Sequence, residues 1–294
     1  MGDIFMVKGD ETIILSNSCN FHGVNDTENM LEVCIDSLES AINAIYGGAD
    51  ELEVCSSLTE GGLTPSPGLV SQIASVVNNI KNGRLIHKSC SQYSYGKKTL
   101  KVPKVNVMIR CRTGSDFCYN DFEMDTMLSD IDHFKQFEID RFVFGALTDS
   151  QEIDEKNCKK IIERASPTPV TFHRAFDVCK EPNATVTKII NLGFNRLLTS
   201  GQRCTAADSE ALVLIRTLLE SFSDKIEIMP GAGVNVDNAK LFIDMGCKIL
   251  HSSCKITKYL NKAGNNLRMG EGDSEFIYVT DENIVKEMKL KMEN

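Results

Sequence analysis

Two cysteines stand in identical sequence contexts that could bring two thiols together. Leu-Glu-Val-Cys occurs at 31–34 and again at 52–55, so Cys34 and Cys55 each end a short β-prone run. Thiolates on the ends of adjacent strands could hold a soft metal such as Cu(I), which accepts few sulfur ligands in a low-coordination geometry. Two other interpretations stay open, because free cysteine also packs as a small apolar residue and oxidised cysteines form structural disulfides.

Acidic, basic and imidazole side chains end other β-prone runs. Glu53, Arg110 and His173 are such residues. His173 and Glu53 could exchange protons with an anionic small molecule while Arg110 holds its charge, as in a lyase or isomerase. The alternatives are a structural ion-pair network of Glu32, Glu53 and Arg110, and a hydrogen-bonded structural role for His173.

A glycine-containing turn offers a second place for an anion. Met-Pro-Gly-Ala-Gly-Val-Asn occupies 229–235, where Gly231 and Gly233 allow backbone N–H groups to turn toward a ligand. A tight turn without a ligand is equally consistent with this motif. Ala232 lies between the two glycines and would oppose a left-handed conformation if the turn needs one there.

These residues need a scaffold that brings strand ends together, and the hydrophobic pattern supplies one. From residue 30 onward, short β-rich runs alternate with longer amphipathic runs, which is typical of βα units and a parallel sheet. The eight predicted strands favour one (β/α)8 barrel of the TIM type over a doubly wound sheet with a second domain. They lie at 31–35, 51–55, 105–110, 141–145, 169–173, 196–200, 226–229 and 247–251.

Alternation along each strand predicts which side chains face the barrel axis. The apolar set of the first strand must meet the helices, which leaves Glu32 and Cys34 for the axis, and the second strand divides in the same way. Barrel enzymes place their chemistry at the carboxyl ends of the strands. The polar residues predicted on the axis are Glu32, Cys34, Glu53, Cys55, Asn106, Arg110, Thr171 and His173, with Thr199 and His251 less certain.

Composition excludes several classes of protein. The 294 residues carry a formal net charge of -9, which argues against a nucleic-acid partner because phosphate backbones bind basic faces. The sequence has no run of 18 apolar residues and no secretory signal, so we expect neither a membrane segment nor export. The eleven cysteines lack a Cys-x-x-Cys pair and are expected to be free thiols in the cytosol.

The chain divides into a leader and one domain. Residues 1–29 hold little periodic pattern and are expected to be a poorly ordered leader, and residues 30–294 are expected to form the barrel. A polar, tyrosine-bearing insertion at 82–104 joins a helix end to a strand start, so we expect it on the face opposite the site.

The motifs resemble the CutC copper homeostasis family in order and spacing, from about residue 30 to 255. Val-Thr-Phe-His-Arg-Ala-Phe-Asp at 170–177 and Ile-Met-Pro-Gly-Ala-Gly-Val-Asn at 228–235 are two of the matching blocks. The others lie at 31–41, 47–56, 60–66, 106–110, 143–148 and 198–201.

The resemblance implies a (β/α)8 barrel, a cytoplasmic location, a connection with copper and assembly into homo-oligomers. It places proposed Cu(I) ligands at Cys34 and Cys55. Its enzyme-like mouth implies Glu53, Arg110, His173 and Asp177 as catalytic candidates, and Arg174 with Arg110, Gly231 and Gly233 as anion-binding candidates.

One loop departs from the family pattern. Arg110-Cys-Arg-Thr-Gly-Ser-Asp-Phe117 is one residue longer than usual, with cysteine in place of proline.

The sequence as a whole leads to three hypotheses: a cytosolic Cu(I)-binding protein, an enzyme acting on a small anionic metabolite, and an oligomeric scaffold with a vestigial site.

Overall fold

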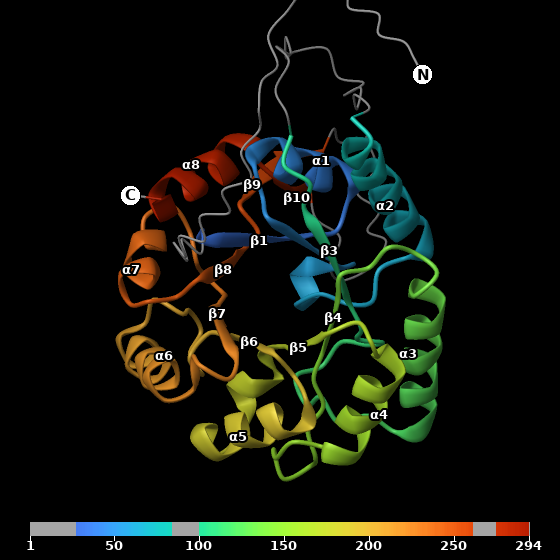
Figure 1. The fold of residues 1–294 in the computed structure, drawn as a ribbon, viewed down its shortest axis with the longest axis vertical. Coiled ribbons are helices and arrows are strands. Elements are labelled where there is room, and N and C mark those ends of the chain that lie inside the picture. The colour runs from blue at the N-terminus through green and yellow to red at the C-terminus, as the bar shows by residue number, and fades with distance from the viewer. Residues whose placement is uncertain (1–27, 84–99, 261–274, 294) are drawn as a thin grey trace, which may run out of the picture.

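The computed structural model describes residues 28–83, 100–260 and 275–293, and at its centre eight parallel strands curve into a nearly closed barrel (Figure 1). Their order is β7-β6-β5-β4-β3-β2-β1-β8, and parallel ladders join all neighbours in that order. The seam lies between β7 and β8, which are side by side. The predicted (β/α)8 barrel is therefore confirmed. The strands are β1 (Met30–Ile35), β2 (Glu51–Val54), β3 (Lys104–Met108), β4 (Arg141–Phe144), β5 (Val170–Phe172), β6 (Arg196–Thr199), β7 (Glu227–Pro230) and β8 (Ile249–Ser252).

Helices surround the barrel, and five of them begin at a capping side chain that the sequence supplies. Ser66 accepts a hydrogen bond from the N–H of Leu69, and Asn120 forms a reciprocal capping box with Glu123. The helices are α1 (Leu38–Gly47), α2 (Pro67–Lys81), α3 (Asp121–Phe134), α4 (Glu155–Ala165), α5 (Pro182–Leu192), α6 (Ser209–Phe222), α7 (Ala239–Asp244) and α8 (Glu282–Glu293).

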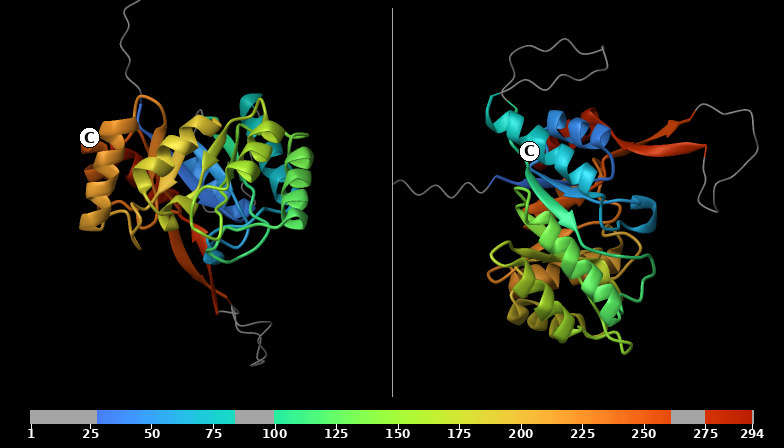
Figure 2. Two further views of the ribbon diagram at one scale, coloured as in Figure 1. Left: turned by 90° about the horizontal axis from the view of Figure 1, so that it is seen from below. Right: turned by 90° about the vertical axis from the view of Figure 1, so that its right-hand side faces the viewer.

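Two further strands follow the barrel and were not among the predicted elements. β9 (Lys255–Tyr259) and β10 (Phe276–Thr280) form an antiparallel pair that projects from the barrel (Figure 2). The chain then returns through α8, which packs against α1 and α7. Among the described residues, no helix is both long enough and apolar enough to cross a bilayer.

The register confirms the predicted alternation in the first two strands. Leu31, Val33 and Ile35 are completely buried in the main core between sheet and helices. Cys34 on β1 lies opposite Glu53 on β2. The polar residues between the apolar ones therefore face the axis, as expected from the period of two in a strand.

A layer of polar side chains, called the polar layer below, fills the barrel axis near the amino ends of the strands. Arg196 on β6 is 1% exposed and binds Glu51 through two hydrogen bonds, Nη1–Oε2 at 2.6 Å and Nη2–Oε1 at 3.1 Å. Asn106 donates to Glu51 Oε2 at 2.7 Å and to Glu32 Oε2 at 2.5 Å. Burial would raise the pKa of Glu51, but binding by Arg196 and Asn106 lowers it to about 2.

One predicted alternative is thereby confirmed only in part. Glu32 does belong to a structural network across the axis, and Glu53 is linked to Glu32 through His251, but within the described residues Arg110 forms no ion pair with either glutamate.

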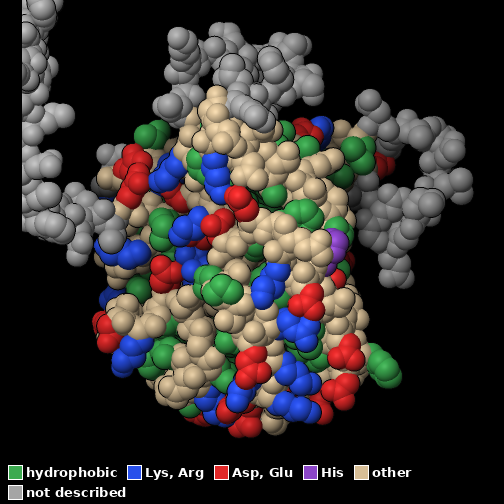
Figure 3. All heavy atoms as spheres, turned by 45° about the vertical axis from the view of Figure 1, so that its right-hand side comes forward, with side chains coloured by type: hydrophobic (Ala, Val, Ile, Leu, Met, Phe, Trp, Pro, Cys, Tyr) green, Lys and Arg blue, Asp and Glu red, His purple; other side chains and the backbone are tan. Residues whose placement is uncertain are grey.

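The leader and the insertion lie largely outside the described residues, at 1–27 and 84–99. At the edge of the described residues, Asn29 donates to Met292 O and Glu28 pairs with Lys101. Lys101 also pairs with Asp50, just before β2, so residue 101 lies at the amino ends of the strands. The leader and the insertion stay predictions. On the face seen in Figure 3, acidic and basic side chains are intermixed.

Candidate metal and anion site

A cavity of about 920 Å³ opens at the carboxyl ends of the strands. Its walls bring together seven of the nine residues predicted for the site. The other two, Cys55 and Gly231, do not line the cavity. Glu53, Arg110 and His173 share this cavity without forming ion pairs with one another in the described part of the chain. The seven residues are Cys34, Glu53, Arg110, His173, Arg174, Asp177 and Gly233.

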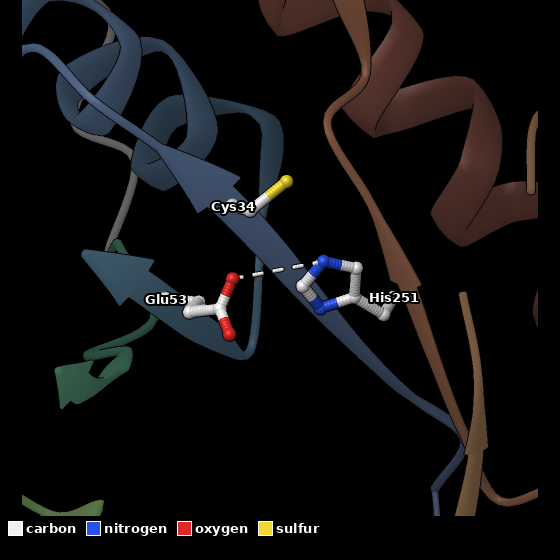
Figure 4. A group of neighbouring side chains, drawn as sticks. All are labelled: Cys34, Glu53 and His251. Carbon is white, nitrogen blue, oxygen red and sulfur yellow. Dashed lines mark ion pairs between the residues drawn. The ribbon is translucent and has the colours of Figure 1, made fainter. Parts of the chain in front are cut away.

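Cys34, Glu53 and His251 form a compact cluster of ligand-type atoms in this cavity. One such atom from each residue lies within 4.8 Å of the others. They come from the neighbouring strands β1, β2 and β8, and Figure 4 shows the thiol, carboxylate and imidazole gathered over the ends of these strands. Glu53 Oε2 lies 3.7 Å from His251 Nε2. A thiol, an imidazole and a carboxylate are together a set that can bind a metal ion.

The Glu32 carboxylate orients the His251 imidazole from the side of the polar layer. Its Oε1 lies 2.8 Å from His251 Nδ1, while its Oε2 belongs to the polar layer. Carboxylates commonly hold one nitrogen of a metal-binding histidine in this way and leave the other free for a ligand. The sequence placed His251 on the axis with less certainty, although its position at a strand end ranked it among the site residues, and its pairing with Glu32 joins positions 219 residues apart.

Burial and mutual charge shift the pKa values of the cluster. Burial raises the pKa of Glu53 to about 7, against the opposing effect of His251. For His251 burial acts in the lowering direction, but the negative charges of Cys34 and Glu53 raise its pKa well above the ordinary value. Groups that interact this closely titrate as a unit rather than one by one.

Cys55 lies beside the cluster, in a drier position. Its side chain is completely buried against Met108 and Val143, and Sγ lies 3.4 Å from Glu53 Oε2. Burial and the charge of Glu53 raise the pKa of the Cys55 thiol well above its usual range. Its predicted role as a metal ligand stays a prediction.

Arg110 organises loops with most of its guanidinium. Nη1 donates to the carbonyl oxygens of Glu60 and Gly62 at 2.9 and 3.0 Å, and Nη2 donates to Gly114 O at 2.7 Å. Its Nε has no hydrogen-bond partner among the described residues. Among the described residues, the N–H of Nε and the second N–H of Nη2 are left for the predicted anion contact, which stays a prediction.

His173 is a buried, neutral imidazole. Burial, followed by the charge of Arg110, lowers its pKa to about 3. Nδ1 accepts the Ala175 N–H at 3.2 Å, so the proton of the neutral ring is on Nε2, which has no partner among the described residues. Its arrangement suits a hydrogen-bond donor better than the predicted proton acceptor.

Asp177 and Arg174 hold the end of β6. Asp177 accepts hydrogen bonds from Thr199 Oγ1 at 2.6 Å and from the N–H and hydroxyl of Ser200 at 3.0 and 2.8 Å. Arg174 Nε donates to Asp177 Oδ2 at 2.8 Å. The Asp177 carboxylate is occupied by these donors, so its predicted catalytic role finds no support in the geometry.

The turn after β7 adopts the conformation that Ala232 was expected to oppose. Ala232 has φ 71° and Gly233 has φ 75°. A left-handed alanine costs about 1–2 kcal/mol, and the rest of the turn must hold it there. At Gly233 a Cβ would lie 2.3 Å from Thr205 Oγ1, so glycine is required there for space as well as for conformation.

Strained residues occur in four loops around the cavity. Ser57, Phe117, Ala232 and Cys254 have positive φ values of 48°, 52°, 71° and 44°, and they follow β2, β3, β7 and β8. Backbone strain of this kind persists where the surroundings impose it, and it concentrates at functional sites.

Comparison with known proteins agrees with this geometry. The model of the CutC family matches residues 29–256. A human protein named copper homeostasis protein cutC homolog is 39% identical over 230 residues, which cover 78% of this chain and 74% of the relative. A Caenorhabditis elegans protein of the same name is 39% identical over 263 residues, which cover 89% of this chain and 94% of that relative. A solved CutC structure from Streptococcus agalactiae has a TM-score of 0.64 at 28% identity, covering 76% of this chain and 98% of that one.

Proposed function

Because the chain belongs to the CutC family, we propose that it serves copper homeostasis by binding Cu(I) at the mouth of its barrel. The observation that supports this most directly is the cluster of Cys34, Glu53 and His251, whose ligand-type atoms lie within 4.8 Å of one another.

The chemistry of the donors suits a soft monovalent ion. Cu(I) prefers thiolate and also accepts imidazole, whereas a carboxylate is a hard ligand. Cys34 and His251 are therefore the primary ligands, and Cys55 supplies a second thiolate from its position beside Glu53. The thiols lose their protons when the metal binds, and Glu53 lies at 3.4 Å to accept the proton of Cys55.

The proposed location is the cytosol. All nine cysteines among the described residues are free thiols, a state that a reducing compartment maintains. Assembly into a homo-oligomer stays a prediction.

Anaerobic competition with a chromophoric Cu(I) chelator tests the site. We expect about one tightly bound Cu(I) per chain and its loss in the Cys34→Ala, Cys55→Ala double variant. Cys34→Ala alone should weaken binding more than Cys55→Ala, because Cys34 lines the cavity and belongs to the cluster.

The exposed thiol of Cys204 provides a matched control. Cys204→Ala removes a cysteine outside the cavity and should leave stoichiometry and affinity unchanged. Wild-type Cu(I) binding by the double variant would exclude these two cysteines as the site.

A further inference from the structure

The cavity has two chemically different ends. Its carboxylates belong to the end of β2 and to the loops after β1, β2 and β5: Glu53, Asp36, Glu60 and Asp177. Among the described lining residues that follow β7 and β8, there is no carboxylate. This second end includes the turn at 232–235, Ser252 at the end of β8, Ser253, Lys255 and part of β10 (residues 276–278 and 280).

The turn after β7 offers backbone donors that its own fold leaves free. Its carbonyl groups are occupied: Ala232 O accepts the Ala206 N–H at 2.9 Å, and Val234 O accepts the Ser252 hydroxyl at 2.7 Å. By contrast, the N–H groups of Ala232, Gly233 and Val234 donate no hydrogen bond in the described parts of the chain. Val234 is 4% exposed, whereas Ala232 is half-buried and Gly233 is exposed, and all three residues line the cavity.

Two side chains add donors to the same cavity. Lys255 has no carboxylate partner among the described residues, and its Nζ lies 3.7 Å from the centre of the Tyr278 ring. His173, 3% exposed, lines the cavity with an unpartnered Nε2. A buried donor of this kind is available to a water molecule or to a ligand group in the cavity.

The turn also lies directly beside the metal-type cluster. A Cβ added at Gly231 would lie 2.5 Å from Leu198 Cδ1 and 3.3 Å from Cβ and Cδ2 of His251, so the start of the turn packs against both the wall of the cavity and the His251 side chain. A molecule that occupies the turn would therefore extend toward His251 and Glu53.

We propose that this end of the cavity binds the oxyanion group of a small organic molecule, a phosphate or a carboxylate. The N–H groups of residues 232–234 and the Lys255 ammonium contact the oxyanion, and the remainder of the molecule lies toward Glu53 and His251. A volume of about 920 Å³ is that of an organic-ligand site and far exceeds the space one metal ion needs. The apolar walls of Leu58, Met108 and Leu198 are suited to a carbon skeleton.

The test uses full-length, metal-free protein labelled with ¹⁵N, titrated separately with inorganic phosphate and with malonate at constant ionic strength. We expect a saturable shift of the amide signals of residues 232–234 with one probe or both. Saturation with phosphate alone identifies a phosphorylated ligand, and saturation with malonate alone identifies a carboxylate.

Two exposed lysines of β9 separate a built site from general surface charge. Lys255→Ala should weaken binding about tenfold, while Lys258→Ala, which loses only the pair with Glu39 outside the cavity, should stay within twofold. Absence of saturation with both probes, or equal weakening by both substitutions, would overturn the proposal. Because no copper is present, the outcome is independent of Cu(I) binding.

Discussion

Replacing Arg196 by methionine should destabilise the barrel more than any exposed charge change. The guanidinium binds Glu51 at 2.6 and 3.1 Å, Glu227 at 2.8 Å and Glu32 at 3.5 Å, and the Arg196 side chain is 1% exposed. Methionine fills a similar volume but removes the main cation from two buried carboxylates: among the described residues, Glu51 keeps Lys104 at 3.4 Å and Glu32 keeps His251 as ion-pair partners.

The magnitude follows from the burial of these carboxylates. Glu51 and Glu32 are 1% and 0% exposed, whereas Glu227 is 43% exposed and can be hydrated after the change. Removing one partner of a buried ion pair costs about 3–5 kcal/mol. For a domain of this size, about 2–4 °C per kcal/mol translates into a fall in Tm of roughly 10 °C.

Urea unfolding followed by circular dichroism measures this loss. Arg164→Met is the control, because Arg164 and Asp132 form an exposed pair and such pairs contribute about 0–1 kcal/mol. Adding Glu51→Gln to Arg196→Met should recover at least half of the lost stability. The neutral amide removes the buried negative charge that Arg196 binds most closely in the wild-type protein. A loss below about 1 kcal/mol in the single variant, or no recovery in the double variant, would refute the reasoning.

Two further substitutions test the mouth. Glu32→Gln should weaken Cu(I) binding about tenfold in the chelator competition, because it removes the charge beside His251 Nδ1; Glu39→Gln, at an exposed pair, is the control, and equal affinities would contradict the orienting role. His173→Asn should flatten the pH dependence of stability. The pKa of His173 is lowered to about 3 by burial, so below the unfolded value of 6.5 the unfolded state binds more protons and stability falls as pH falls. Between pH 7 and 5 wild type should lose about 2 kcal/mol more than the variant, measured by urea unfolding; exposed His133→Asn should keep the wild-type slope.

The side-chain directions in β1 and β2 could be predicted because the sequence there leaves one choice. Leu-Glu-Val-Cys has apolar residues at alternate positions, and these must meet the helices. Cys34 and Glu53 were placed correctly on the axis for this reason, and the strand order then made them neighbours.

The partners of charged residues could not be predicted in the same way. Arg196 begins a short strand, where an arginine resembles a solvated end, and its partner Glu51 is 145 residues distant. Arg110 was expected to bind an anion, but its Nη atoms bind the carbonyl oxygens of Glu60, Gly62 and Gly114. Every residue carries a carbonyl oxygen, so no sequence pattern marks these partners.

The β9–β10 pair was missed for a different physical reason. All five residues of β9 are exposed, so no buried face imposes an alternating pattern on Lys-Ile-Thr-Lys-Tyr. Its pairing partner begins at Phe276, beyond a segment outside the described residues. A strand that is paired along its edge but buried on neither face leaves little hydrophobic signal.

Glu32 joins the structural layer to the candidate site, since its two oxygens have different partners. Oε2 accepts from Asn106 at 2.5 Å and lies 3.5 Å from Arg196, while Oε1 lies 2.8 Å from His251 Nδ1. Loss of Arg196 from the polar layer therefore changes the orientation and charge of the His251 imidazole through Glu32, although Arg196 does not line the cavity. Arg196→Met should accordingly weaken Cu(I) binding at temperatures where the variant is fully folded. Unchanged affinity would mean that residues around the cavity position His251 without the Arg196 network, and the role of that network would then be purely structural.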